Sequence, residues 1–292
     1  MALFGGSQIS EGSKATYMSK LKKLNGNQIP TGLMFLKDTK TIMKKIELIQ
    51  NPNTRRSSII AVVSVLKGNK KFKKEYQVYH AEMMKINAVL NKESFKSDST
   101  KAKQDNVKMA DLLARQKELA AIMPIIQKKK KISDDQLQQL HDLVVVSLYT
   151  LLPPRRNVDY SEMVVAAPTE DKTKNFYHAG KFVFNIYKTK NTYNQQVVDV
   201  PEELNAILKL WIKLKPNGSE YLLINLQTNA KIKSSDMTKL LKQVFQNEHI
   251  GVSVLRNVFL SEKYSGLMED LKKDAAQMGT SICVAENTYI KK

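Results

Sequence analysis

Apolar residues recur at helical spacing along most of this 292-residue chain, and this pattern limits the folds that it can adopt. Stripes with a period of three to four residues predict amphipathic helices over 41–49, 54–66, 72–90, 107–123 and 133–152. Alternation typical of strands is clearest from Lys181 to Tyr187, and Gln196 to Val200 follows after a short turn. The sequence therefore predicts a mainly α fold with a small antiparallel β-sheet, which is an α+β class.

Positive charge is concentrated in the first half of the chain. Residues 1–131 hold 27 Lys and Arg against 10 Asp and Glu, whereas residues 132–292 hold 20 against 18, and the net charge is +19. So large an excess of one sign favours a polyanionic partner, and nucleic acid is expected before a membrane surface. The candidate phosphate contacts are Lys22, Lys23, Arg55, Arg56, Lys128, Lys129, Lys130 and Lys131. The run of four lysines also fits a nuclear-localisation signal, and the sequence does not separate these two interpretations.

A polar, lysine-rich stretch between about Lys92 and Lys108 has the composition of a linker. We therefore expect a basic helical DNA-binding domain over 1–95, a linker with a connecting helix over 96–131, and a second domain over 132–292. In the first domain Thr54 is the expected cap of the helix that carries Arg55 and Arg56.

Several classes of site and location are excluded by composition. The single cysteine, Cys283, cannot form an internal disulfide or a cysteine-cluster zinc site, and the four histidines lack a metal-ligand spacing. We expect neither a metal nor a cofactor. The chain lacks an apolar run of membrane-spanning length and a signal-peptide pattern, so it is expected to be intracellular, in the host nucleus or cytoplasm with its target DNA, and not secreted.

Polar residues of the second half stand in an order that suits chemistry on a phosphodiester. Two prolines end a helix and set Arg155 and Arg156 at the start of the next element, and Lys188 and Lys190 lie in the turn between the two predicted strands. Ser253 precedes Arg256 as the expected N-cap of a helix. A glycine turn at Gly279-Thr280 then comes nine residues before Tyr289.

This order resembles the tyrosine recombinase (phage integrase) family, over nearly the whole chain, because the basic helical half is similar to the core-binding domain of that family. The resemblance assigns the first arginine to Arg156, which begins an Arg-x-x-acid motif ending at Asp159, with Arg155 out of register. It assigns the second arginine to Arg256, the hairpin lysine to Lys190 with Lys188 as the close second, and the nucleophile to Tyr289.

Two positions depart from the family pattern. Ser253 and Thr280 stand where the family usually has histidines, and a hydroxyl can donate a hydrogen bond to a phosphoryl oxygen but cannot act as an acid or base near neutral pH. Each assigned residue also has a structural interpretation. Arg156 fits a pair with Asp159, Lys190 an exposed turn, and Tyr289 a side chain packed on the core.

The resemblance implies an enzyme of viral or mobile-element type that cleaves and rejoins duplex DNA through a 3′-phosphotyrosyl intermediate. It implies site-specific strand exchange or integration, without metal or ATP, by a homo-tetramer assembled on DNA. Two alternatives remain. A type IB topoisomerase uses a similar set of residues, and the substitutions at Ser253 and Thr280 fit a DNA-binding derivative with weakened catalysis.

Overall fold

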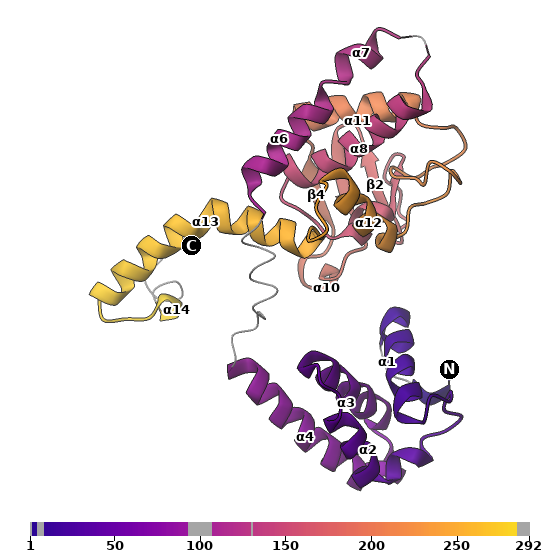
Figure 1. The fold of residues 1–292 in the computed structure, drawn as a ribbon, viewed down its shortest axis with the longest axis vertical. Coiled ribbons are helices and arrows are strands. Elements are labelled where there is room, and N and C mark those ends of the chain that lie inside the picture. Colours follow the sequence, from indigo (N-terminus) through magenta and orange to yellow (C-terminus); the bar gives the residue numbers. More distant parts are fainter. Residues whose placement is uncertain (1, 5–8, 93–106, 130, 285–292) are drawn as a thin grey trace. The chain divides into compact units, whose positions relative to one another are not determined.

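The computed structural model describes residues 2–4, 9–92, 107–129 and 131–284, and the chain divides into two compact units, 1–97 and 98–292 (Figure 1). Both units are dominated by helices, and a four-stranded sheet lies in the second. The predicted mainly α, α+β class is therefore confirmed. Within the described part of the chain, no helix has both the length and the apolar character needed to cross a bilayer.

Unit 1 is a helical bundle built around α3. Its elements are η1 (Ala2–Phe4), α1 (Glu11–Leu24), η2 (Met34–Lys37), α2 (Thr39–Glu47), α3 (Pro52–Leu66), η3 (Lys70–Phe72) and α4 (Lys73–Lys92). Helix α3 packs against both α1 and α4, and its Ile59, Val62 and Leu66 are fully buried. The N-cap of α3 is Asn51, whose side chain accepts the Thr54 N–H, with Pro52 at the first helical position. The prediction of Thr54 as the cap was wrong, because the asparagine before the proline takes that role.

Unit 2 contains the remaining elements. They are α6 (Met109–Ala120), α7 (Met123–Gln127), α8 (Asp134–Thr150), α9 (Asn157–Ser161), β1 (Met163–Val165), β2 (Asn175–His178), β3 (Lys181–Phe184), α10 (Lys190–Tyr193), β4 (Gln196–Asp199), α11 (Glu202–Leu214), α12 (Ser234–Val244), α13 (Val252–Gln277) and α14 (Ile282–Val284). Helix α6 packs on α8, so the helix expected to connect the domains belongs to the fold of unit 2.

The sheet has the order β1-β2-β3-β4 and is mixed rather than wholly antiparallel. Strands β3 and β4 form the predicted antiparallel pair, with Phe182 opposite Val198, whereas β1 pairs with β2 in the parallel direction. The turn between β3 and β4 is longer than expected, because the short helix α10 interrupts it and begins at Lys190.

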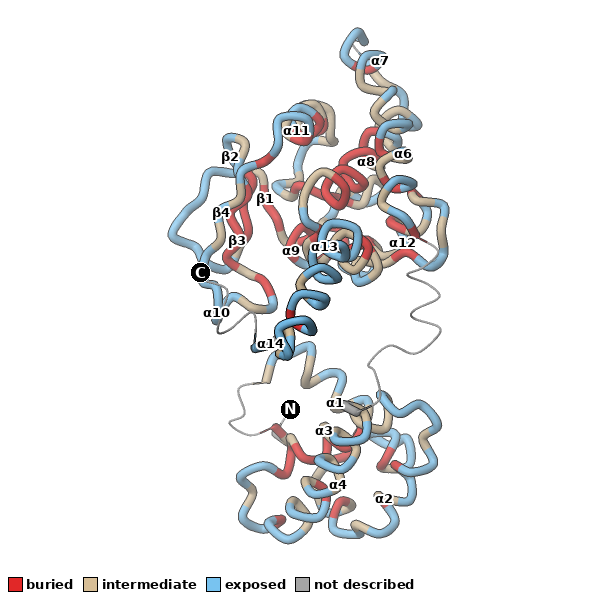
Figure 2. The backbone as a smooth tube through the Cα atoms, turned by 90° about the vertical axis from the view of Figure 1, so that its left-hand side faces the viewer, coloured by how far each residue is buried: buried red, intermediate tan, exposed pale blue. Residues whose placement is uncertain are grey.

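Helix α8 is the centre of the unit 2 core (Figure 2). A capping box between Ser133 and Gln136 fixes its start, and from Leu143 to Thr150 every residue is buried. Trp211 of α11 is also fully buried, and its indole N–H donates to the Leu222 carbonyl at 2.7 Å. This core fixes the C-terminal end of α8, from which Pro153 and Pro154 lead to Arg155 and Arg156.

Candidate functional site: an arginine-lined cavity at the start of α13

A cavity of ≈ 560 Å³ opens in unit 2 where α9, α12 and α13 begin or end near one another. Arg156 and Arg256 both line it, although they lie a hundred residues apart in the sequence. Ser253 lines the same cavity one turn before Arg256. Three of the residues assigned by the family resemblance are therefore brought to one place.

Asn157 holds the start of α9 in position. Its side-chain nitrogen donates to the Ser234 carbonyl at 3.1 Å and to the Thr238 hydroxyl at 3.0 Å, and its side-chain oxygen accepts the Tyr149 hydroxyl at 2.7 Å. These bonds tie α9 to α12 and α8. Because Arg156 is the N-cap residue directly before Asn157, the same bonds fix the backbone from which Arg156 projects. Sequence reasoning missed this positioning residue, since a single asparagine after an arginine pair carries no distinctive signal.

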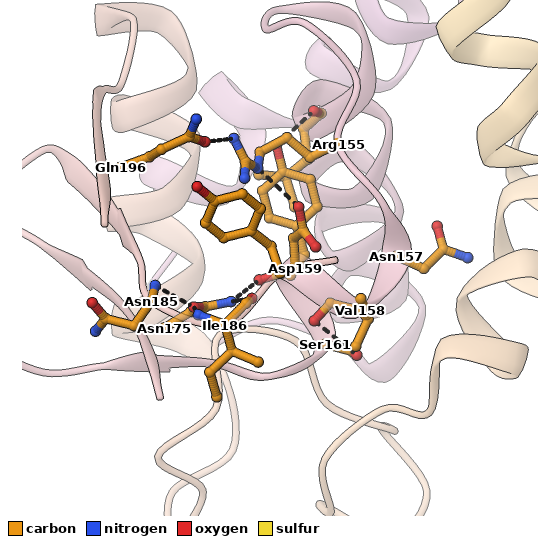
Figure 3. Close-up of polar contacts among 12 residues, drawn as sticks. Arg155, Asn157, Val158, Asp159, Ser161, Asn175, Asn185, Ile186 and Gln196 are labelled. Atoms are coloured by element: carbon orange, nitrogen blue, oxygen red, sulfur yellow. Dashed lines mark hydrogen bonds and ion pairs between the residues drawn. The ribbon is translucent and has the colours of Figure 1, made fainter. Parts of the chain in front are cut away.

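Arg155 and Arg156 have different environments, although they are neighbours in the sequence. The Arg155 Nε atom lies 3.0 Å from the Asp159 carboxylate and Nη1 donates to Gln196 at 2.9 Å (Figure 3). Its guanidinium also stacks over Phe184, at 3.8 Å from the ring centroid. Arg155 is thus a structural residue that joins α9 to the sheet. Arg156 forms no ion pair among the described residues, so the carboxylate that was one possible partner for Arg156 is taken by Arg155.

Asp159 is the buried acid of the Arg-x-x-acid motif. It is 2% exposed, and burial raises the pKa of its carboxyl, although Arg155 first and then Arg156 and Arg256 act in the opposite direction. A carboxylate that interacts electrostatically with three guanidiniums lowers their mutual repulsion. Asp159 therefore helps to hold Arg156 and Arg256 beside one cavity, although neither of them forms an ion pair among the described residues.

The first turn of α13 adds further positive potential. Its N-cap is Gly251, and no side chain caps the first N–H groups of this 26-residue helix. The prediction of Ser253 as the N-cap was wrong: Ser253 is the second residue of the helix and is exposed, so its hydroxyl is available to the cavity. A helix N-terminus, two arginines and Lys242 around one cavity form a site suited to an anion, and Glu248, paired with Lys242 at 3.3 Å, is the acid on its wall.

His249 was missed by sequence reasoning and also lines this cavity. Its backbone N–H is held by the Asn247 side chain at 2.8 Å, while its side chain is exposed. His249 lies four residues before Ser253, the position where the resembled family usually has a histidine. This short distance is the sequence signal that could have identified His249.

Two other assigned residues do not line the cavity. Lys190 begins α10 and is exposed, as is Lys188. Thr280 follows the end of α13, where Gly279 adopts a φ of 69° and the Thr280 N–H donates to the Ala275 carbonyl at 2.8 Å. This is a Schellman helix end, and it lies about 32 Å along the helix from Arg256, at about 1.5 Å per residue. Thr280 is therefore not at the arginine cavity in this structure, and Tyr289 lies outside the described residues.

In unit 1 the two candidate arginines are partly used by the fold. The Arg55 guanidinium donates to the Ile49 carbonyl through Nε at 3.2 Å and Nη2 at 2.9 Å, so it closes the loop between α2 and α3. The phosphate contact predicted for Arg55 stays a prediction, and Nη1 is the guanidinium nitrogen that these two bonds do not use. Arg56 is half-buried, and its Nε atom has no partner among the described residues.

The lysines of unit 1 are better placed for phosphate. Lys22 and Lys23 are exposed at the end of α1, and Lys23 lines a second cavity of ≈ 430 Å³ together with Lys20 and Lys45. No acidic side chain lines that cavity, although the Lys45 ammonium donates to the Leu24 carbonyl at 2.9 Å. We define Lys20, Lys22 and Lys23 as the α1 basic patch.

The lysine run lies between α7 and α8. Lys128, Lys129 and Lys131 are exposed, and the Lys129 ammonium donates to Gln136 at 3.3 Å, while Lys130 lies outside the described residues. Across the described ranges, no three His, Cys, Asp or Glu side chains gather in an arrangement that could hold a metal ion. No family model, curated protein or solved structure matches this chain.

Proposed function

We propose that this protein is a tyrosine recombinase or integrase, which cleaves and rejoins duplex DNA through a 3′-phosphotyrosyl intermediate and exchanges strands at specific sites. The observation that carries the proposal is that Arg156 and Arg256 line one cavity at the start of α13. Neither guanidinium is paired with a carboxylate among the described residues, so both are available to a phosphate.

The two arginines would bind the scissile phosphate and stabilise the negative charge that grows on its non-bridging oxygens. Guanidinium groups suit this role because they are planar, permanently charged and able to donate two parallel hydrogen bonds. The N-terminus of α13 and the Ser253 hydroxyl would donate further hydrogen bonds to the same oxygens.

The covalent step would be an in-line displacement at phosphorus. The Tyr289 hydroxyl gives its proton to His249 as its oxygen forms a bond to phosphorus, the bond to the 5′-oxygen breaks, and that oxygen takes a proton from Lys190. Rejoining is the reverse, with a 5′-hydroxyl attacking the phosphotyrosine. The bond energy is retained in the intermediate, so neither metal nor ATP is required.

Proton transfer in this proposal falls to Lys190 and His249. Lys190 would protonate the leaving 5′-oxygen after the β3–β4 connection moves toward bound DNA. His249 would take up the role that Ser253 cannot fill, because an imidazole acts as an acid and a base near neutral pH. His249→Ala is then expected to lower the cleavage rate about 100-fold.

The free protein would hold this site in an incomplete form. Helix α13 ends about 32 Å from Arg256, and α14, which follows it, contacts α13. Tyr289 lies five residues after Val284 at the end of α14, and five residues span at most about 17–18 Å. DNA binding would complete the site, by a break in α13 or by supply of the tyrosine from a neighbouring subunit. Both routes agree with action as a homo-tetramer on two DNA sites.

The position of Thr280, far from the arginine cavity, supports a second candidate. This is a DNA-binding protein without cleavage activity. A chain in which α13 stayed intact on DNA would keep its arginine cavity as a phosphate anchor and would never form the covalent adduct. The type IB topoisomerase alternative differs in outcome, since it would relax supercoiled plasmid without joining two sites.

A suicide DNA substrate, with a nick that lets the leaving strand diffuse away, tests the proposal. Wild-type protein is expected to form a covalent protein–DNA adduct that Tyr289→Phe loses while keeping its DNA affinity. Tyr193→Phe, at an exposed tyrosine of α10, is the matched control and should cleave normally. Binding without an adduct on cognate sites supports the second candidate, and plasmid relaxation without two-site exchange supports the topoisomerase.

A further inference from the structure

The distal half of α13 carries an apolar stripe of which three residues are exposed and the fourth, Leu271, is half-buried. Leu260, Tyr264, Leu267 and Leu271 follow one another at intervals of four, three and four residues, so they lie along one face of the helix. Leu260, Tyr264 and Leu267 are 52%, 41% and 66% exposed. We call these four residues the α13 seam.

The rest of α13 differs from the seam. Leu255 and Val258, in its first turns, are buried in the unit 2 core, and Ala275, near its end, is also buried. Between these two points every residue from Leu260 to Asp274 except Leu271 is exposed. A helix with an apolar stripe of this kind is stable in water when a partner covers the stripe.

We propose that the α13 seam binds the same seam of a second copy of this chain, as a two-stranded antiparallel coiled coil with two-fold symmetry. The spacing of the seam is the heptad pattern of coiled coils, with Tyr264 and Leu271 at one core position and Leu260 and Leu267 at the other. An antiparallel pair puts Leu260 against the partner's Leu271 and Tyr264 against the partner's Leu267. In this register all four seam residues are covered, and no polar residue enters the layers between them.

Charge selects a second copy in this direction as the occupant. Lys263 and Asp270 lie on the same flank of the seam, seven residues apart, and neither forms an ion pair among the described residues. In the antiparallel register Lys263 faces the partner's Asp270, and symmetry repeats the pair at the other end. A parallel pair would instead place Lys263 nearest the partner's Met268. The inference does not depend on the proposed chemistry, because pairing can be measured without DNA.

Sedimentation of the full chain in the absence of DNA tests the pairing. Over a concentration series the wild type is expected to approach twice the 33.2 kDa chain mass. Leu267→Glu should keep the monomer mass, whereas Ser265→Glu, which adds the same charge on a face of the helix away from the seam, should dimerise like the wild type. Leu267 is exposed, so helix content by circular dichroism should be unchanged in the monomeric variant.

Charge exchange tests the direction. Lys263→Asp and Asp270→Lys should each weaken the dimer at least tenfold by setting like charges opposite each other, and the double variant should restore it. A wild type that stays monomeric overturns the proposal. A lower melting temperature of Leu267→Glu without a change in mass also overturns it, because the seam would then pack on its own chain. Failure of the double variant to recover overturns the antiparallel register.

Discussion

Unit 1 and unit 2 use positive charge in different ways. Unit 1 holds 18 Lys and Arg against 6 Asp and Glu, and the α1 basic patch forms no ion pair among the described residues. Unit 2 is closer to balance, with 29 against 22, but sets beside one cavity two arginines that form no ion pair within the described part of the chain. A diffuse surface of lysines gives affinity for a polyanion, whereas fixed guanidiniums recognise one phosphate. Affinity and cleavage should therefore be separable by mutation.

The largest effect is expected from the arginine cavity. Arg256→Ala should lower the rate of covalent adduct formation about 100- to 1000-fold, because it removes a donor that stabilises charge in the transition state. DNA affinity, measured by fluorescence anisotropy, should stay within about threefold of the wild type, since the proposed function assigns most phosphate contacts to other residues. Lys213→Ala, on α11 of the same unit, is the control. Normal cleavage by Arg256→Ala would disprove the assignment of the site.

Substitution of Arg155 should affect the stability of unit 2, whereas substitution of Arg156 should not. Arg155→Ala leaves the Asp159 carboxylate buried without its partner and should lower the free energy of unfolding by about 3 kcal/mol. Urea unfolding followed by the fluorescence of Trp211, the single tryptophan, measures unit 2 alone. Arg156→Ala should leave stability nearly unchanged. The double variant Arg155→Met/Asp159→Asn should recover most of the loss, and the absence of recovery would show that stacking on Phe184 dominates.

The core of unit 2 should also be sensitive to pH in a way that unit 1 is not. His141 is buried against Trp211 without a hydrogen-bond partner on either nitrogen among the described residues, and burial lowers its pKa to about 4. The folded state thus binds a proton less readily than the unfolded chain. Stability should fall as pH drops below about 6.5, by about 2 kcal/mol at pH 5. His141→Phe should remove this loss, and an equal loss in that variant would assign the pH dependence to other groups.

The smallest effect is expected from the α1 basic patch. Lys20→Gln/Lys23→Gln should reduce the slope of log affinity against log salt by about 1.8, because each phosphate contact contributes about 0.9. The cleavage rate at saturating protein should not change. Lys213→Gln/Lys209→Gln in unit 2 is a control of equal charge. An unchanged slope would show that the patch does not contact DNA.

The helical class, the β3–β4 pair and the capping of α8 follow from short-range pattern, since periodicity and caps depend on neighbouring residues. Ser133, for example, is the first residue of the helix predicted over 133–152 and is the N-cap of α8 in the structure. The environments of Arg155 and Arg156 depend instead on which side chains the fold brings close. The pair with Asp159 spans four residues, but the contacts with Gln196 and Phe184 form only when the sheet is assembled.

The N-caps of α3 and α13 could not be predicted from residue type alone. Serine and threonine are common N-cap residues, which made Ser253 and Thr54 the expected caps. The N-caps in the structure are Gly251 for α13 and Asn51 for α3. The turn before each helix decides between neighbouring candidates, and that turn is set by packing. His249 was missed for a related reason: its value comes from the cavity that it lines, which joins segments far apart in the chain.

Gly266 lies in the exposed middle of α13, where an added Cβ would meet no atom within 4 Å. A glycine in a helix interior costs about 1 kcal/mol relative to alanine, and no packing at this position offsets that cost. Amide hydrogen exchange should therefore divide one continuous helix into a slow segment anchored at Leu255 and Val258 and a fast segment beyond Gly266. Slower amide exchange in the segment beyond Gly266 would then show when a partner binds the second half of α13.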